Sequence, residues 1–154
     1  MANIQSDTEF RSNLSSLSLG QQRRVGKLFI DHVLELADNP KVKKAVAIAG
    51  ETEPSAADIA EGYKAASTAA TETYTLCGRE ADWRRQASHF VAAAAAACLS
   101  PEVKEQQCDD VAWTTAMNAR MARVCEKIAE GEGYDNSEIG VQYRILEEFL
   151  RTTS

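Results

Sequence analysis

Six consecutive alanines follow an aromatic residue in the segment "SHFVAAAAAACLSP" (88–101). Alanine has the highest helix propensity and no side-chain rotamer entropy to lose, so this run favours a helix whatever surrounds it. Its methyl groups also form a smooth cylinder that a neighbouring backbone can approach closely. We therefore expect Ala92–Ala97 to lie in a central helix that is contacted on several sides. A homodimer seam along the same alanines would demand the same small residues, and that alternative stays open.

Signals for the start of a helix recur along the chain. Ser6, Ser18 and Ser55 each stand three residues before a Glu, Gln or Asp, the spacing of a capping box or a related N-terminal signal. Asn39 precedes Pro40, and proline is favoured at the first helical position. No stretch alternates apolar and polar residues between turn residues, as a half-buried strand would. The sequence therefore predicts an all-α fold.

Apolar residues recur at helical spacing after these signals. We expect helices from Ser6 through Leu14, from Ser18, from Pro40 to Gly50, over 56–77, from Trp83 to Cys98, from Pro101 to about Glu130 with a break near Gln107, and from about Ser137. "NLSSLSLG" (13–20) is predicted to be a linker and "EGEGYDN" (130–136) a loop. The expected buried stripes are Val25, Leu28, Phe29, His32, Val33 and Leu36; Val42, Val46 and Ala49; Ile59, Tyr63, Ala66, Ala70 and Tyr74; Trp83, Ala87, Phe90, Val91, Ala94 and Cys98; Trp113, Met117, Met121, Val124 and Ile128; and Ile139, Tyr143, Leu146, Phe149 and Leu150.

The length and the connections indicate how these helices assemble. A chain of 154 residues is long enough to bury a core of its own. Short connections favour antiparallel neighbours in a bundle. We predict one domain over residues 1–154, an antiparallel bundle of about six helices. Residues 1–18 are expected to form a loosely attached N-terminal segment.

Charge and cysteine content narrow the environment and the partners. The net charge of −6 argues against nonspecific binding to nucleic acid, which depends on neutralising phosphates. Three short basic clusters are expected to be solvated helix faces: Arg23, Arg24 and Lys27; Lys41, Lys43 and Lys44; and Arg84 with Arg85. No signal-peptide pattern and no run of about 18 apolar residues is present, so we expect a cytoplasmic chain that does not enter a membrane.

Neither the cysteines nor the histidines form a recognisable reactive or metal-binding pattern. The four cysteines are unpaired in sequence and read as reduced thiols: Cys77, Cys98, Cys108 and Cys125. His32 and His89 are far apart, and neither has the Glu three residues before it that a helical di-iron site requires. We predict no catalytic residues, no metal and no cofactor, which favours a non-enzymatic role.

Two sets of residues are candidates for binding. Tryptophan and arginine are enriched at interface hot spots, and methionine suits an adaptable contact surface. The partner-binding candidates, from "GREADWRRQASHF" (78–90) and the helix after it, are Trp83, Arg84, Arg85, His89, Arg120 and Arg123. The structural alternative is that Trp83 is a core residue and that the neighbouring arginines form ion pairs with Glu80 and Asp82 within the helix. A second hypothesis is an interhelical pocket for a small apolar ligand, lined by Tyr63, Tyr74, Trp83, Phe90, Trp113 and Met117.

The order of several segments resembles that of small α-helical bacterial immunity proteins. The segments are "RVGKLFIDHVLELADNP" (24–40), the alanine-rich "SHFVAAAAAA" (88–97) and "VAWTT" (111–115), and "QYRILEEFL" (142–150). This resemblance implies an immunity-type or regulatory protein that acts through contact with a protein partner. It carries no functional residues to this sequence.

Overall fold

The computed structural model describes residues 3–76, 82–100, 111–132 and 137–153, with only the backbone described for 74–76. These residues form seven α-helices and one short 3₁₀ helix, without a β-strand, so the all-α prediction is confirmed with one helix more than the expected six. The elements are α1 (Asp7–Ser15), α2 (Leu19–Val33), η1 (Leu34–Leu36), α3 (Pro40–Ala49), α4 (Ala56–Leu76), α5 (Trp83–Cys98), α7 (Val111–Ala129) and α8 (Ser137–Thr153). The expected break near Gln107 and the residues Cys77 and Cys108 lie outside the described ranges.

The predicted helix starts are confirmed by the hydrogen bonds around them. Ser6, Ser18 and Ser55 each accept a bond from the backbone amide three residues later, at 3.2, 3.2 and 3.0 Å. Asn39 accepts one from the amide two residues later, at 2.9 Å. These oxygens satisfy amides that have no partner within the first helical turn. The predicted linker 13–20 is shorter than expected, because α1 continues to Ser15 and α2 starts at Leu19.

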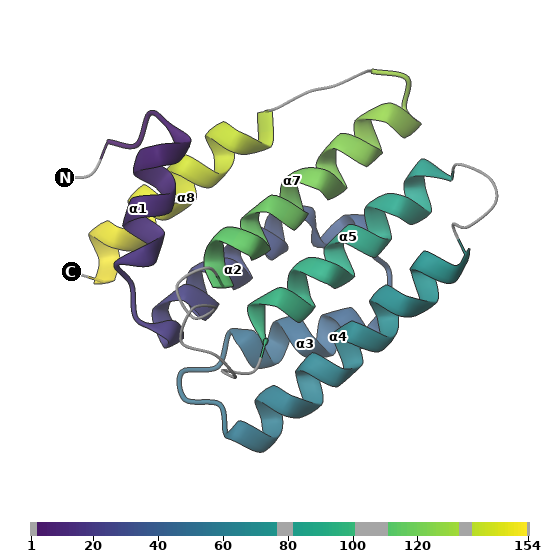
Figure 1. Cartoon of the computed structure of the whole chain (residues 1–154), viewed down its shortest axis with the longest axis horizontal. Helices are drawn as coiled ribbons and strands as arrows, with labels where there is room; N and C mark the ends of the chain where they lie inside the picture. Colours follow the sequence, from purple (N-terminus) through teal and green to yellow (C-terminus); the bar gives the residue numbers. More distant parts are fainter. Residues whose placement is uncertain (1–2, 77–81, 101–110, 133–136, 154) are drawn as a thin grey trace.

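Three long helices form an antiparallel row across the molecule. α4, α5 and α7 lie side by side with alternating chain direction, while α2 and α3 pass behind them (Figure 1). α5 stands at the centre and packs against α2, α3, α4 and α7. Ala92, Ala94 and Ala95 are fully buried there. The prediction that the alanine run forms a central helix is therefore confirmed.

The first helix is packed rather than loosely attached. Phe10 and Leu14 of α1 have no exposed surface, and Ile4 is also buried. The amide of Ile4 donates to a carboxylate oxygen of Glu147 in α8 at 2.8 Å. Figure 1 shows α1 and α8 together at one end of the row. The expectation of a loose segment over residues 1–18 does not fit these contacts, because two of its large side chains complete the core between α2, α7 and α8.

The stripe predicted to be buried on α7 is not the buried side of that helix, although Trp113 and Met117 pack against the core around Phe10 and Phe29. The side of α7 that packs inward carries Ala112, Ala116, Ala119 and Ala122, none of which is exposed. At 100° per residue, the predicted stripe of larger side chains falls on the opposite side. Met121 in that stripe is 44% exposed. Close packing of α5 on α7 requires small side chains at the contact, and the bulkier residues therefore turn outward.

On the other helices, most residues at the centre of each predicted stripe are buried as expected, and single residues at the edge or end of a stripe are exposed. Val25, Phe29, Val33, Ala87, Val91, Ala94, Cys98, Leu146 and Phe149 are buried. Leu28 and Trp83 are each 38% exposed, and His32 is also exposed. Leu28 and His32 lie at the edge of the α2 stripe, and Trp83 is the first residue of α5, where fewer neighbours cover it. None of the described helices combines the length and the apolar character needed to cross a bilayer.

Gly62 of α4 lies against the core with no room for a side chain. A Cβ atom there would lie 2.7 Å from a methyl group of the buried Leu99 and 3.0 Å from one of Ile48. We expect Gly62→Ala to lower the free energy of unfolding by about 1–2 kcal/mol, because overpacking outweighs the gain in helix propensity. Gly20 is the matched control, since nothing lies within 4 Å of its added Cβ. Urea unfolding should show Gly20→Ala to be neutral or stabilising; an equal loss in both variants would contradict the assignment.

Candidate functional site

A buried polar network joins α2, α7 and α8. The carboxylate of Glu138 accepts from Arg123 Nε at 3.1 Å through Oε1, and its Oε2 lies 2.7 Å from His32 Nδ1. Arg123 also donates to the backbone oxygen of His32 at 2.9 Å and pairs with Glu126 at 2.8 Å. The side chains of Glu138 and Arg123 are only 3% and 11% exposed. Each buried charge therefore has an opposite charge and hydrogen-bond partners, which burial requires.

A second polar network fastens α1 to α7 and α8. The Arg120 guanidinium donates two bonds to the Asp7 carboxylate, at 2.9 and 3.0 Å, and a third to the Gln142 side chain at 2.7 Å. Tyr143 donates to the same carboxylate at 2.8 Å, and Arg120 also lies over the ring of Phe10. The hydrogen bond from Arg120 keeps the pKa of Asp7 below its usual value, and that from Tyr143 acts in the same direction.

The pH dependence of stability should reveal the Asp7 contact. A carboxylate with a lowered folded-state pKa stabilises the protein above its unfolded pKa of about 3.9, and this stabilisation is lost as pH falls through the folded pKa. Because Asp7 is partly exposed, we expect Asp7→Asn to cost only about 1 kcal/mol at pH 6. Urea unfolding at pH 6 and pH 3 should show a smaller decline for the variant than for the wild type. Equal declines would contradict the role of Asp7.

These networks use two of the six predicted partner-binding residues. Arg120 and Arg123 are engaged inside the chain, with side chains 12% and 11% exposed, so neither offers a free cation to a partner. His89 also faces inward, with its Nδ1 2.8 Å from the carbonyl oxygen of Ala70 in α4. Sequence spacing could not reveal these roles, because Asp7 lies 113 residues from Arg120.

The remaining three predicted partner residues lie together at the start of α5. Trp83, Arg84 and Arg85 are exposed. Arg85 pairs with Asp82, whose side chain also caps the helix by accepting from the Arg85 amide at 3.2 Å. The structure thus keeps a small exposed group at this helix end and separates it from Arg120 and Arg123. Partner binding by the group stays a prediction.

Of the six residues predicted to line one ligand pocket, the five whose side chains the structure describes do not share one pocket. Tyr63 and Phe90 border the core formed by α3, α4, α5 and their neighbours. Trp113 and Met117 border the other core, around Phe10 and Phe29. Trp83 is exposed at the start of α5, and the structure does not describe the side chain of Tyr74. The predicted pocket is therefore wrong in the residues it brings together.

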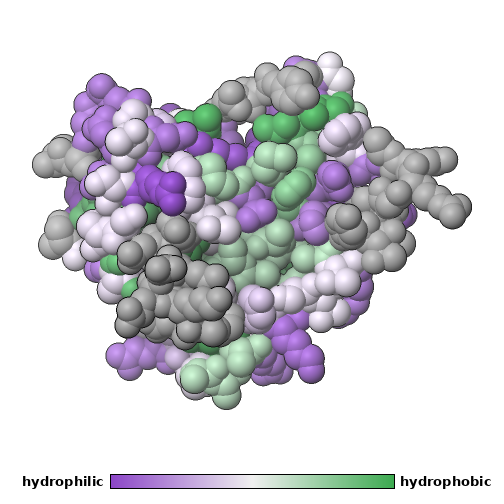
Figure 2. All heavy atoms as spheres, viewed as in Figure 1, coloured by the Kyte–Doolittle hydropathy of each residue, from purple (hydrophilic) through white to green (hydrophobic). Residues whose placement is uncertain are grey.

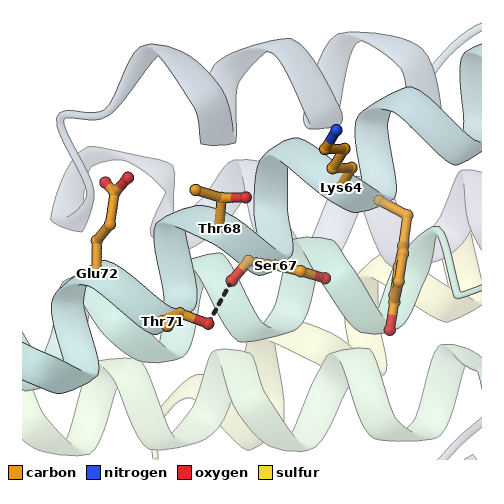
Figure 3. Close-up of a pocket in the computed structure, with 6 residues that line it drawn as sticks. Lys64, Ser67, Thr68, Thr71 and Glu72 are labelled. Carbon is orange, nitrogen blue, oxygen red and sulfur yellow. Dashed lines mark hydrogen bonds between the residues drawn. The ribbon is translucent and has the colours of Figure 1, made fainter.

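A hollow of about 390 Å³ on α4 is too simple to be a built site. Its lining residues all come from α4: Tyr63, Lys64, Ser67, Thr68, Thr71 and Glu72. Figure 3 shows them along successive turns, with the Thr71 hydroxyl bonded to the Ser67 carbonyl oxygen at 3.0 Å. Glu72 is already paired with Lys41 of α3. No wall from a second helix encloses this hollow among the described residues, so it is a depression along one helix flank.

The lysines of the basic clusters and the described cysteines match their predicted roles, whereas Arg23 is half-buried and donates to the carbonyl oxygen of Ser100 at 3.1 Å instead of lying on a solvated face. Lys27, Lys41, Lys43 and Lys44 each form an ion pair with a carboxylate, as expected of solvated helix faces. Cys98 and Cys125 are buried and unbridged. Burial raises the pKa of the Cys98 thiol to about 12, which keeps it protonated and unreactive. Within the ranges that the structure describes, no group of three or more His, Cys, Asp or Glu side chains could hold a metal ion.

An uncharged apolar face extends over α5 and α7. On α5 the half-exposed side carries Phe90, Ala93, Ala96 and Ala97, and on α7 it carries Met117, Met121, Val124 and Ile128. We call these eight residues the α5–α7 face. Figure 2 shows hydrophobic surface gathered over these two helices at the centre of the view. Contiguous apolar surface of this kind marks interaction sites on otherwise polar proteins. The α5–α7 face is therefore the candidate functional site.

Part of this face had a signal in the sequence. From Gln86 to Ser100 the chain has no Asp, Glu, Lys or Arg, although such residues make up 26% of the whole. From Val111 to Cys125 the only charged residues are Arg120 and Arg123. What the sequence did not reveal is that both arginines turn inward, which leaves the outer side of α7 uncharged from Val111 to Cys125. Comparison of the chain with protein families, curated proteins and solved structures finds no match.

Proposed function

We propose that this chain is a non-enzymatic, cytoplasmic interaction module that assembles through the α5–α7 face, with a second copy of the chain as the occupant. One observation carries the proposal: two adjacent helices each present a row of half-exposed apolar side chains with no charged residue among them. Depletion of charge with enrichment of methionine and aromatic residues is typical of the centre of a protein interface.

The inward direction of the two arginine side chains on α7 supports an interface at this face. Arg120 and Arg123 reach back to Asp7 and Glu138 rather than out to solvent. A charge on the outer side would have to be desolvated on docking, and leaving it unpaired would weaken association. Met121 projects there instead, 44% exposed. Its flexible, polarisable side chain fills irregular gaps well.

The distribution of large and small side chains on the face supports self-association. Large side chains stand along α7, while Ala93, Ala96 and Ala97 make the neighbouring surface of α5 flat. A two-fold axis between the helices would place the α7 stripe of each copy on the alanine surface of the other. The face lacks charged groups that would select a different partner by electrostatic complementarity. These features fit a second copy better than a heterologous protein.

The experiment is sedimentation equilibrium of the wild type and of two matched variants. Met121→Glu places a charge at the centre of the face, whereas Leu28→Glu changes a leucine of similar exposure on α2. We expect a wild-type dimer, and an unpaired buried charge costing about 3 kcal/mol would weaken it roughly a hundredfold in Met121→Glu. Leu28→Glu should dimerise normally.

Two results would contradict the proposal. A wild type that stays monomeric at all concentrations would remove the second copy as the occupant. Equal weakening by Leu28→Glu would place the interface elsewhere. The resemblance to immunity proteins favours a different protein as the partner. A monomer that forms a defined one-to-one complex with such a protein would support an immunity-type role and contradict self-association.

A further inference from the structure

A groove of about 650 Å³ runs between α2 and α8, away from the α5–α7 face. Its volume is within the range of small-molecule sites. The lining residues are Leu28, Asp31, His32, Val141, Arg144, Ile145, Glu148, Phe149 and Thr152. Four of them, Leu28, Val141, Ile145 and Phe149, supply apolar surface from both helices. The groove thus has an apolar lining and polar edges, which suits an amphipathic occupant.

The charges at the edges of the groove are unevenly compensated. Asp31 is paired with Lys27 at 2.6 Å, and Glu148 is paired with Arg151. Arg144 is exposed and has no carboxylate partner within the described residues. Its guanidinium is therefore available to a ligand, and its planar fork of donors matches a carboxylate.

His32 is held in a fixed orientation at the same groove. Its Nδ1 lies 2.7 Å from Glu138 Oε2, while the other oxygen of that carboxylate accepts from Arg123. Because Glu138 and Arg123 are buried, they anchor the imidazole from behind. Its Nδ1 is occupied, so Nε2 is the ring nitrogen that remains for a ligand. A few fixed polar groups beside apolar walls are the usual composition of a ligand site.

We propose that the α2–α8 groove binds a single-chain aliphatic carboxylate. The carboxylate lies on Arg144, and the His32 ring lines the same groove. The aliphatic chain lies along Leu28, Ile145 and Phe149. This ligand satisfies the uncompensated cation and covers the apolar lining at once. The proposal is independent of self-association, because none of the groove residues belongs to the α5–α7 face.

Isothermal titration calorimetry with decanoate and with 1-decanol, both below their aggregation limits, tests the proposal. We expect decanoate to bind one to one and at least tenfold more tightly than decanol, because charge-assisted hydrogen bonds contribute at about this level. Arg144→Gln should lose about tenfold in affinity for decanoate. Leu28→Gln should weaken both ligands, because it removes apolar contact at an exposed position that the fold tolerates.

Two controls separate this site from others. Arg84→Gln removes an exposed arginine on α5 that does not line the groove, and its affinity for decanoate should match that of the wild type. Met121→Glu should also bind normally, so that failure of the dimer does not affect the result. No decanoate binding, equal affinity for the alcohol, or an unchanged affinity in Arg144→Gln would each overturn the proposal.

Discussion

Replacing Phe10 by alanine is expected to lower the free energy of unfolding by about 3–5 kcal/mol, one of the two largest effects of a single substitution in this chain. Phe10 has no exposed surface, and its ring centroid lies 5.3–6.1 Å from those of Phe29, Trp113 and Tyr143. Arg120 also lies over the ring, at 5.3 Å. The truncation would leave a cavity at the junction of α1, α2, α7 and α8.

Urea unfolding at one fixed protein concentration measures this loss. Tyr63→Ala is the matched control, because Tyr63 is only half-buried, lies outside the α5–α7 face, and opens no closed cavity when it is removed. We expect its loss to be less than half that of Phe10→Ala. If Phe10→Ala cost less than about 1 kcal/mol, α1 would be loosely attached after all, as the sequence had indicated.

Replacing Arg123 by methionine is expected to cost about 3–5 kcal/mol, because Glu138 would keep a buried charge without its main partner. Among the described residues, Glu138 would retain only the contact with His32, whose side chain is 44% exposed. The double variant Arg123→Met with Glu138→Leu removes both charges and should be more stable than Arg123→Met alone. Replacing a buried ion pair by apolar side chains of similar size is often nearly neutral.

A surface pair provides the control for this second prediction. Lys44 and Glu61 join α3 to α4 with both side chains about half exposed, so Lys44→Met should change stability by less than about 1 kcal/mol. Urea unfolding of the wild type, Arg123→Met, Glu138→Leu and the double variant measures the coupling between Arg123 and Glu138 directly. A double variant that loses as much stability as the two single losses added would contradict the pairing.

Local signals were sufficient to predict where the helices start. The caps at Ser6, Ser18, Asn39 and Ser55 depend on residues no more than three positions apart, and all four are present. The buried side of α7 was predicted wrongly because the prediction followed residue size. Large apolar residues suggested the inner face, but helices packed this closely place alanine at the contact.

Contacts between distant residues were beyond prediction from sequence spacing. Gln22 of α2 accepts from the backbone amide of Ala112 at 3.1 Å, and so caps α7 from a position 90 residues away. The inward turn of Arg123 depends on the same kind of distant partner, His32 being 91 residues away. The uncharged segment 86–100 was visible in the sequence. That this segment shares a face with α7 could not be predicted, because the shared face depends on both arginines of α7 pointing inward.

The rate at which Met121 is oxidised by hydrogen peroxide tests the central claim most directly. Met121 is 44% exposed on the single chain, and its side chain lies at the centre of the α5–α7 face. Peptide mass analysis would follow its oxidation in wild-type protein held far below and far above the dimer dissociation constant. We predict that oxidation slows severalfold as the dimer forms, because the partner covers the thioether. A concentration-independent rate in a sample shown to be dimeric would place the interface on another face, and our account would be wrong.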